Sequence, residues 1–190
     1  AYCKKRYPGA TIYVVTESVL SMDGDSPDVK QLSSFCTAQG LYLVVDEAHA
    51  VGVFGKGLVS QAGLEQEVFA ILVTFGKAMG GHGAAILGSE PLVNYLLNFS
   101  RSLIYTTALS PHSTALVKAS YLYLDSLEGK AAVDTLKQLI VHFRKTVADL
   151  ELNSLFLESH SSIQIAQLKD NDAAKQLSES LRMKGFDVRA

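Results

Sequence analysis

The residue with the clearest chemical potential in this chain is Lys77. It follows the apolar run 68–73 and lies in the glycine-rich sequence TFGKAMGGHG, directly before a second apolar run, 84–87. A lysine between two core segments is costly unless its amine has a use, and glycines let the backbone approach a bound group closely. Two chemistries use such a lysine: phosphate binding in a nucleotide site, and Schiff-base formation with a carbonyl.

The phosphate-loop alternative does not match the residues around either glycine–lysine pair. The pattern GxxxxGK[ST] requires a hydroxyl residue after the lysine, but Ala78 stands there, and Ile71 stands where the first glycine belongs. Lys56 fails as well, because Gly57 follows it. Schiff-base chemistry therefore remains, and with pyridoxal phosphate it also needs an acid opposite the ring nitrogen of the cofactor.

Asp46 can supply that acid. The preceding run LYLVV, 41–45, is apolar on both faces, as in a central parallel strand. Ligands of open α/β sheets bind beyond the carboxyl ends of the strands, so we expect Asp46 and Lys77 at one edge of one sheet. An aspartate beside a pyridine nitrogen keeps it protonated, and the protonated ring withdraws electrons from a substrate carbanion.

Four segments, taken together and in order, resemble the α-oxoamine synthases, which are pyridoxal-phosphate enzymes with the aspartate-aminotransferase-type fold (fold type I). They are SMDGD (21–25), VVDEAHAVGVFGKG (44–57), TFGKAMGGHGAAILGS (74–89) and FSRSLIYTTALSPH (99–112). The resemblance implies an acyltransferase that condenses an amino acid with an acyl-CoA and releases carbon dioxide. It is greatest to the members of biotin synthesis, which use L-alanine and pimeloyl-CoA. Glycine C-acetyltransferase and serine palmitoyltransferase chemistry remain alternatives within the family.

The resemblance also implies roles for the residues of the cofactor site. Lys77 holds the cofactor and removes the α-proton of the substrate, and Asp46 pairs with the ring nitrogen. His49 hydrogen-bonds the phenolic oxygen of the cofactor, and Ser21 lies near that oxygen. Without the resemblance, a lysine at a strand end that extends to solvent and an ordinary structural histidine would explain Lys77 and His49 about as well.

Three threonines complete the implied site. Thr74 is expected to contact the cofactor phosphate, and Thr106 and Thr107 to reach it across the interface of a homodimer. No metal site is expected, because the SMDGD segment lacks the rest of the calcium-loop pattern and is explained by a turn at Asp23 and Gly24. The glycine-rich stretch 51–63 is either a phosphate cradle or a surface loop.

Two hypotheses for a function other than that of a pyridoxal-phosphate enzyme remain open at this point. VVDEAH, 44–49, is also the second motif of DEAH-box ATPases, although that function needs a phosphate loop and leaves Lys77 unexplained. A non-catalytic piece that binds partners is the other. We expect the chain to be part of a longer protein and inactive alone, because the family's ring-stacking aromatic residue and carboxylate-binding arginine have no counterparts in it.

The composition limits the partners. With a net charge of −2, a pI near 6.2 and 48% apolar residues in 190, the chain has no basic field for nucleic acid and enough apolar residues for a core. No apolar stretch reaches membrane-spanning length. Cys3 and Cys36 show no metal-ligand spacing. These features predict a cytoplasmic protein.

Periodicity and capping residues predict an α/β fold with a mostly parallel sheet. We expect residues 1–150 to form the later part of a large cofactor-binding domain and its connecting helix, and 151–190 the truncated start of a small α+β domain. Strands are expected over 11–16, 41–45, 68–73, 84–87 and 161–168. Helices are expected from Ser26-Pro27 to Gly40, from Ser89 to Arg101, from Ser110 to about 127, onward as a bent helix to 150, and over 173–184.

Overall fold

Four strands form one mixed sheet in the computed structural model, which describes residues 2–190. They run in the order β1 (Tyr13–Glu17), β2 (Tyr42–Asp46), β3 (Ala70–Thr74) and β4 (Ala84–Gly88). The first three are parallel, and β4 returns antiparallel to β3. The register pairs Glu17 with Asp46 and Asp46 with Leu72. The carboxyl ends of the three parallel strands therefore meet at one edge of the sheet.

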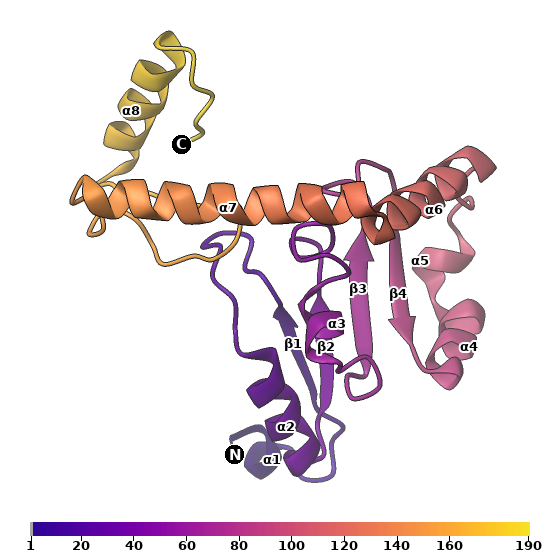
Figure 1. Cartoon of the computed structure of the whole chain (residues 1–190). Helices are drawn as coiled ribbons and strands as arrows, with labels where there is room; N and C mark the ends of the chain where they lie inside the picture. Colours follow the sequence, from indigo (N-terminus) through magenta and orange to yellow (C-terminus); the bar gives the residue numbers. More distant parts are fainter. Residues whose placement is uncertain (1) are drawn as a thin grey trace.

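The helices lie around this sheet and across its carboxyl-end edge. Figure 1 shows the long helix α7 running across the edge to which the arrowhead of β3 points, with α8 standing beyond the sheet. The helices are α1 (Tyr2–Arg6), α2 (Val29–Gln39), α3 (Leu58–Ala62), α4 (Glu90–Phe99), α5 (Arg101–Ile104), α6 (Pro111–Asp125), α7 (Leu127–Asp149) and α8 (Asn171–Met183).

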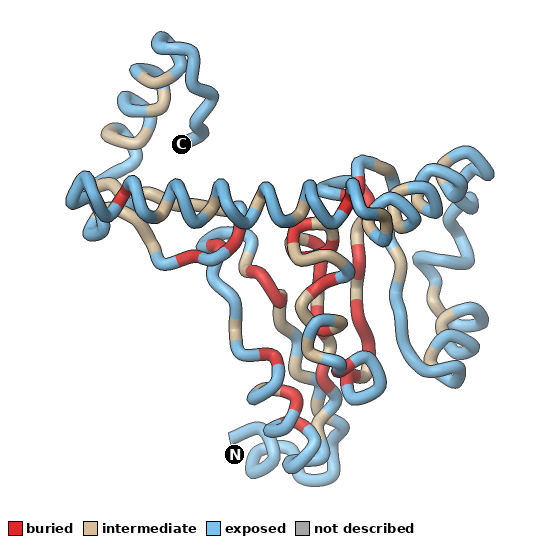
Figure 2. The backbone as a smooth tube through the Cα atoms, in the orientation of Figure 1, coloured by how far each residue is buried: buried red, intermediate tan, exposed pale blue. Residues whose placement is uncertain are grey.

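The core lies between one face of the sheet and the helices α2 and α3. Buried residues gather along β2 and β3 in Figure 2. Leu43 and Val45 of β2 and Ile71 and Val73 of β3 pack in one cluster with α2 and α3 side chains. The other face is more open, since Val15 is 71% exposed. The sequence predicted β2 as a central strand apolar on both faces; Leu43 and Val45 are buried on one face, whereas Tyr42 on the other face is exposed and Val44 half-buried.

Several helix starts follow the capping residues of the sequence. Ser110 Oγ accepts the N–H of Ser113 (3.1 Å) before Pro111 begins α6. Asp170 Oδ1 accepts the N–H of Ala173 (2.8 Å) at the start of α8. Each bond satisfies a backbone donor that the first helical turn leaves free.

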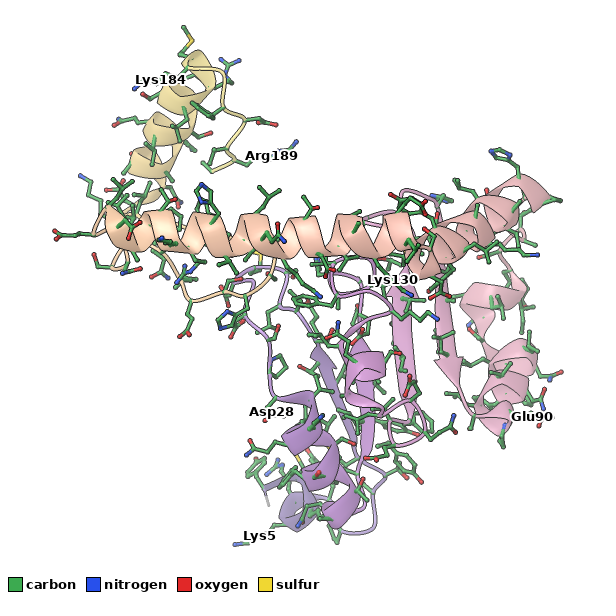
Figure 3. The ribbon with its side chains drawn as sticks, in the orientation of Figure 1. Lys5, Asp28, Glu90, Lys130, Lys184 and Arg189 are labelled. Carbon is green, nitrogen blue, oxygen red and sulfur yellow. The ribbon has the colours of Figure 1, made fainter. Side chains whose placement is uncertain are left out.

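The predicted start of α2 is wrong by two residues. Asp28, labelled in Figure 3 at the upper end of this helix, is its N-cap, and its Oδ1 accepts the N–H of Gln31 (2.9 Å). Pro27 therefore precedes the cap instead of lying in the first turn. An aspartate caps a helix as well as a serine does, and Asp28 takes this place instead of Ser26.

Two further expectations need correction. The bent helix is two helices, α6 and α7, which separate at Ser126, whose Oγ caps α7 through the N–H of Gly129 (3.1 Å). The strand over 161–168 does not form; only an isolated bridge joins Phe156 and Ala166. The boundary near residue 150 stays a prediction.

No helix among residues 2–190 combines the length and the apolarity needed to cross a bilayer.

Candidate active site

Lys77 lies in the tight turn that joins β3 to β4. The turn is closed by the N–H of Phe75, which donates to the carbonyl of Gly83 (2.9 Å), and by the N–H of Gly81, which donates to the carbonyl of Phe75 (2.6 Å). The N–H of Gly80 donates to the carbonyl of Lys77 itself (3.0 Å). These bonds fix the lysine backbone at the carboxyl-end edge, and its side chain is exposed.

The Lys77 amine contacts His49. Nζ of Lys77 lies 2.8 Å from Nε2 of His49, which is in the turn after β2. That turn is closed by the N–H of Ala50, which donates to the carbonyl of Glu47 (2.9 Å). An amine and an imidazole within hydrogen-bond distance can exchange or share a proton, which suits attack on a carbonyl.

Asp46 is the last residue of β2 and lies at the same edge. Its Oδ1 accepts the N–H of Ala48 (2.8 Å), which fixes the orientation of the carboxylate at the start of the turn that carries His49. The structure thus brings the ends of β2 and β3, with Asp46, His49 and Lys77, into one region. A carboxylate, an imidazole and an amine placed in this way can serve both acid–base and carbonyl chemistry.

Thr74 has a buried hydroxyl without a partner. It is the last residue of β3, and its Oγ1 makes no hydrogen bond within the described structure. A buried hydroxyl without a partner costs free energy. Its position three residues before Lys77 makes it available to an acceptor on a group that enters the site, such as a phosphate oxygen.

Ser21 is held by a residue that sequence reasoning missed, Glu17. The N–H of Ser21 donates to Oε2 of Glu17 (2.8 Å), and its hydroxyl donates to Oε1 (3.3 Å). Glu17 ends β1 directly beside Asp46 in the sheet register. A carboxylate at the end of a predicted strand was the available signal, the same one that identified Asp46.

Glu47 is a second residue that sequence reasoning missed. It is 1% exposed, and its Oε1 accepts the N–H of Val59 (3.0 Å) in the first turn of α3. Burial raises the pKa of this carboxyl above its usual range. The N-cap of α3, Gly57, has no side chain to offer, so a carboxylate from the end of β2 bonds the helix start instead.

Thr106 and Thr107 follow α5 and are exposed. The hydroxyl of Thr106 donates to the carbonyl of Ser102, within its own turn. In Figure 1, α5 lies on the far side of β4 from β3. The described contacts do not bring these two threonines to Lys77, so their role stays a prediction.

Comparisons with known proteins show the family to which the chain belongs. A family model described as aminotransferase class I and II matches residues 3–189. The 8-amino-7-oxononanoate synthase of Salmonella paratyphi C is 38% identical over 175 residues, which are 90% of this chain and 44% of that protein. The chain thus spans less than half the length of this curated relative.

Two solved structures show the same fold. The 8-amino-7-oxononanoate synthase of Francisella tularensis superposes with a TM-score of 0.78 at 28% identity, over 96% of this chain and 54% of that one. A lysine-to-alanine variant of serine palmitoyltransferase from S. paucimobilis, with bound PLP–myriocin aldimine, gives 0.83 at 26% identity, over 98% and 49%. Both belong to the α-oxoamine synthases, so the expected fold and the resemblance are confirmed.

Proposed function

The chain belongs to the aminotransferase class I and II family, and we propose that the whole protein is a pyridoxal-phosphate-dependent α-oxoamine synthase. The reaction joins the α-carbon of an amino acid to the acyl carbon of an acyl-CoA. The thioester C–S bond and the bond to the carboxylate break, and CoA and carbon dioxide leave. The proposed substrates are L-alanine and pimeloyl-CoA, whose product is 8-amino-7-oxononanoate.

The observation that carries this proposal is the 2.8 Å contact between Lys77 Nζ and His49 Nε2 at the edge where Asp46 ends β2. A solvent-exposed lysine used only for solubility needs no imidazole partner. A DEAH-box ATPase would use Asp46 and Glu47 for magnesium, but Glu47 is buried against Val59. The family match over most of the chain favours the cofactor function instead.

The residues present suit pyridoxal phosphate. Thr74 Oγ1, buried and without a partner, can donate to a phosphate oxygen. The same carboxyl-end edge of the sheet carries the other proposed cofactor residues, Lys77, Asp46, His49 and Ser21. Pyridoxal phosphate, when bound, supplies an aldehyde for the amine and an electron-withdrawing ring for the substrate carbon. We propose that Thr106 and Thr107 complete the phosphate contacts from the partner subunit of a homodimer, which their exposure permits.

The side chains of this chain would act as follows. The amine of Lys77 binds the cofactor, removes the proton from the α-carbon of the amino acid and later returns one. The Asp46 carboxylate holds a proton on the ring nitrogen, and the bond from Ala48 keeps that carboxylate oriented. His49 would hydrogen-bond the phenolic oxygen of the cofactor, and Ser21, held by Glu17, would help to hold the same part of it.

A reductive labelling experiment tests the proposal. The full-length protein is incubated with pyridoxal phosphate, reduced with borohydride and digested, and the peptides are analysed by mass spectrometry. We expect a phosphopyridoxyl adduct on Lys77 and none in Lys77→Ala, which should also lose all turnover. Lys56→Ala is the matched control, because Lys56 also follows a glycine but pairs with Asp125 at the surface (2.9 Å).

The result separates the alternatives. An adduct on Lys56 alone, or wild-type turnover in Lys77→Ala, contradicts the proposal. Substrate assays then distinguish L-alanine with pimeloyl-CoA from glycine with acetyl-CoA and from serine with palmitoyl-CoA; the likeness to serine palmitoyltransferase makes the last a real competitor. A cytoplasmic location and the division at residue 150 are parts of the proposal that fractionation and limited proteolysis would check.

A further inference from the structure

Two buried serines after α7 bind a single carbonyl in the loop after β1. Ser159 Oγ and Ser161 Oγ donate to the carbonyl oxygen of Gly24 at 2.7 and 2.8 Å. Both serines are 1% exposed, and about 135 residues of chain separate them from Gly24. We call Ser159, Ser161 and Gly24 the serine clamp.

The two serine hydroxyls of the clamp are also held by hydrogen bonds within their own segment. Ser161 N–H donates to Ser159 Oγ (3.1 Å), and Ile163 N–H donates to Ser161 Oγ (3.1 Å), so both hydroxyls are oriented by backbone donors. The side-chain amide of Gln164 donates to the carbonyl of Ser161 (2.8 Å). The two hydroxyls also lie 3.0 Å apart, and the acceptor nearest to each is the carbonyl oxygen of Gly24.

Gly24 is shaped for this contact. Its φ is +75°, and a Cβ on it would lie 2.3 Å from the carbonyl oxygen of Ile163 and 2.8 Å from Ser159 Oγ. A side chain at this position would therefore collide with the backbone of Ile163 and the hydroxyl of Ser159. Only glycine lets the two segments approach so closely.

The clamp segment is also fixed to α7. Nη1 of Arg144 donates to the carbonyl of Leu157 (2.9 Å), and the rings of Phe143 and Phe156 pack edge to face with centroids 5.4 Å apart. Figure 1 shows this segment turning back beneath α7 towards the loop after β1. Its attachment to α7 therefore determines where the two hydroxyls meet Gly24.

The loop that the clamp holds carries Ser21. Gly24 N–H donates to the carbonyl of Leu20 (2.8 Å), and Leu20 N–H donates to the carbonyl of Asp25 (2.9 Å), which closes the loop 20–25. Ser21 lies inside it and bonds Glu17 at the end of β1. A displacement of Gly24 would thus move Ser21 relative to the carboxyl ends of the strands.

We propose that Ser159 and Ser161 are positioning residues that fix loop 20–25, and through it Ser21, for cofactor binding. The effect on cofactor binding rests on the proposed function, whereas the fixing of loop 20–25 by the two serines does not. The segment after α7 thereby acts on the site without touching the cofactor. It links residues 151–190 to the sheet edge at one carbonyl.

The test uses the full-length protein with Ser159→Ala and Ser161→Ala, singly and combined. Ser162→Ala is the matched control, because Ser162 directly follows them and is exposed. Amide hydrogen exchange of Ser21 and Gly24 is measured without cofactor, and the Kd of pyridoxal phosphate is measured by titration. We expect exchange to quicken about fivefold for each hydroxyl removed and the Kd to rise by a similar factor. Ser162→Ala should change neither.

A control for general destabilisation is Cys36→Ala, which removes a buried side-chain atom from α2 in the core beside the sheet. It should lower global stability yet leave the exchange at Ser21 and the Kd unchanged. Wild-type exchange in the double variant overturns the proposal; if the double variant does not fold, the single variants decide in the same way. Faster exchange with an unchanged Kd overturns the cofactor part. Wild-type protein that fails to bind pyridoxal phosphate refutes the proposed function, and the exchange result still decides the clamp.

Discussion

Gly52 lies directly against Ala78, the residue after Lys77: a Cβ built on Gly52 would be 2.6 Å from the Cβ of Ala78. The glycine-rich loop after β2 therefore packs on the turn that carries the lysine. Ser120 of α6 holds that turn from another side, because its hydroxyl donates to the carbonyl of Met79 (2.9 Å). The position of Lys77 thus depends on two elements distant from it in sequence.

The contact predicts unequal effects of two alanine substitutions. Gly52 and Gly55 both have positive φ, +88° and +63°, but only Gly52 has a neighbour that an added Cβ would strike. Both variants pay about 1 kcal/mol for the backbone conformation, and Gly52→Ala should lose about 1–3 kcal/mol more through overpacking. Urea unfolding measures the difference, and equal losses in the two variants would show that the packing is unimportant.

Replacing Thr74 should separate stability from binding. Thr74→Val removes a buried hydroxyl without a partner, so the cofactor-free protein should keep its stability or gain about 1 kcal/mol. The same variant should bind pyridoxal phosphate about tenfold more weakly, because a hydrogen bond to a charged phosphate is lost. Thr74→Ser is the control that keeps the hydroxyl. A valine variant that loses stability and keeps affinity would contradict the assigned role.

Asp46→Asn should affect the chemical step and leave the cofactor attached. The side-chain oxygen of asparagine can still accept the N–H of Ala48, so the turn to His49 should persist and reduction should still label Lys77. The lost charge should slow α-proton removal about 100-fold. Exchange of the α-proton of L-alanine in deuterated water, followed by NMR, measures this step in the full-length protein. An unchanged exchange rate would remove Asp46 from the mechanism.

Glu47 predicts a pH dependence of stability. Its pKa is raised by burial, so the folded state holds its proton at pH values where the unfolded chain has lost it. The stabilisation is therefore full below the unfolded pKa and falls as the pH rises through the folded pKa. Glu47→Gln keeps an acceptor for Val59 N–H but cannot ionise.

The comparison between the two proteins isolates this effect. From about pH 5 to about pH 8, the wild type should lose unfolding free energy relative to Glu47→Gln. Urea unfolding at both pH values gives the two differences. If the difference between wild type and variant does not change with pH, the carboxyl titrates alike in the folded and unfolded states, and the prediction is wrong.

The sequence predicted elements best where local chemistry decided them. Ser110 caps α6 where the helix was expected to start, and Asp170 caps α8 in the same way, because a short side chain beside its own helix needs no distant partner. The strand expected over 161–168 fails because the polar residues of its alternating pattern bond elsewhere. Ser161 binds Gly24, and Gln164 binds its own turn. An alternating pattern shows only which side chains share a face. It cannot show that the hydroxyl of Ser161 donates to the carbonyl of Gly24, 137 residues away in the chain.

In the candidate site, too, some residue positions could be predicted from the sequence and others could not. The positions of Asp46 and Lys77 were predictable, because Asp46 directly follows one apolar run, Lys77 lies in the turn after another, and the ends of parallel strands share an edge. Glu47 was not, because its bond to Val59 depends on how the loop between them folds. The pairing of Lys77 with His49 likewise needs the register of β2 against β3, which the separate apolar runs do not contain.

The pairing of Thr74 with Ala84 closes the turn of Lys77 between two strands of the same sheet. Because β3 also pairs with β2, the lysine and Asp46 share one continuous hydrogen-bonded framework. Moving one relative to the other would require breaking strand pairs. For protein engineering, insertions between residues 70 and 88 would therefore separate the amine from its acid.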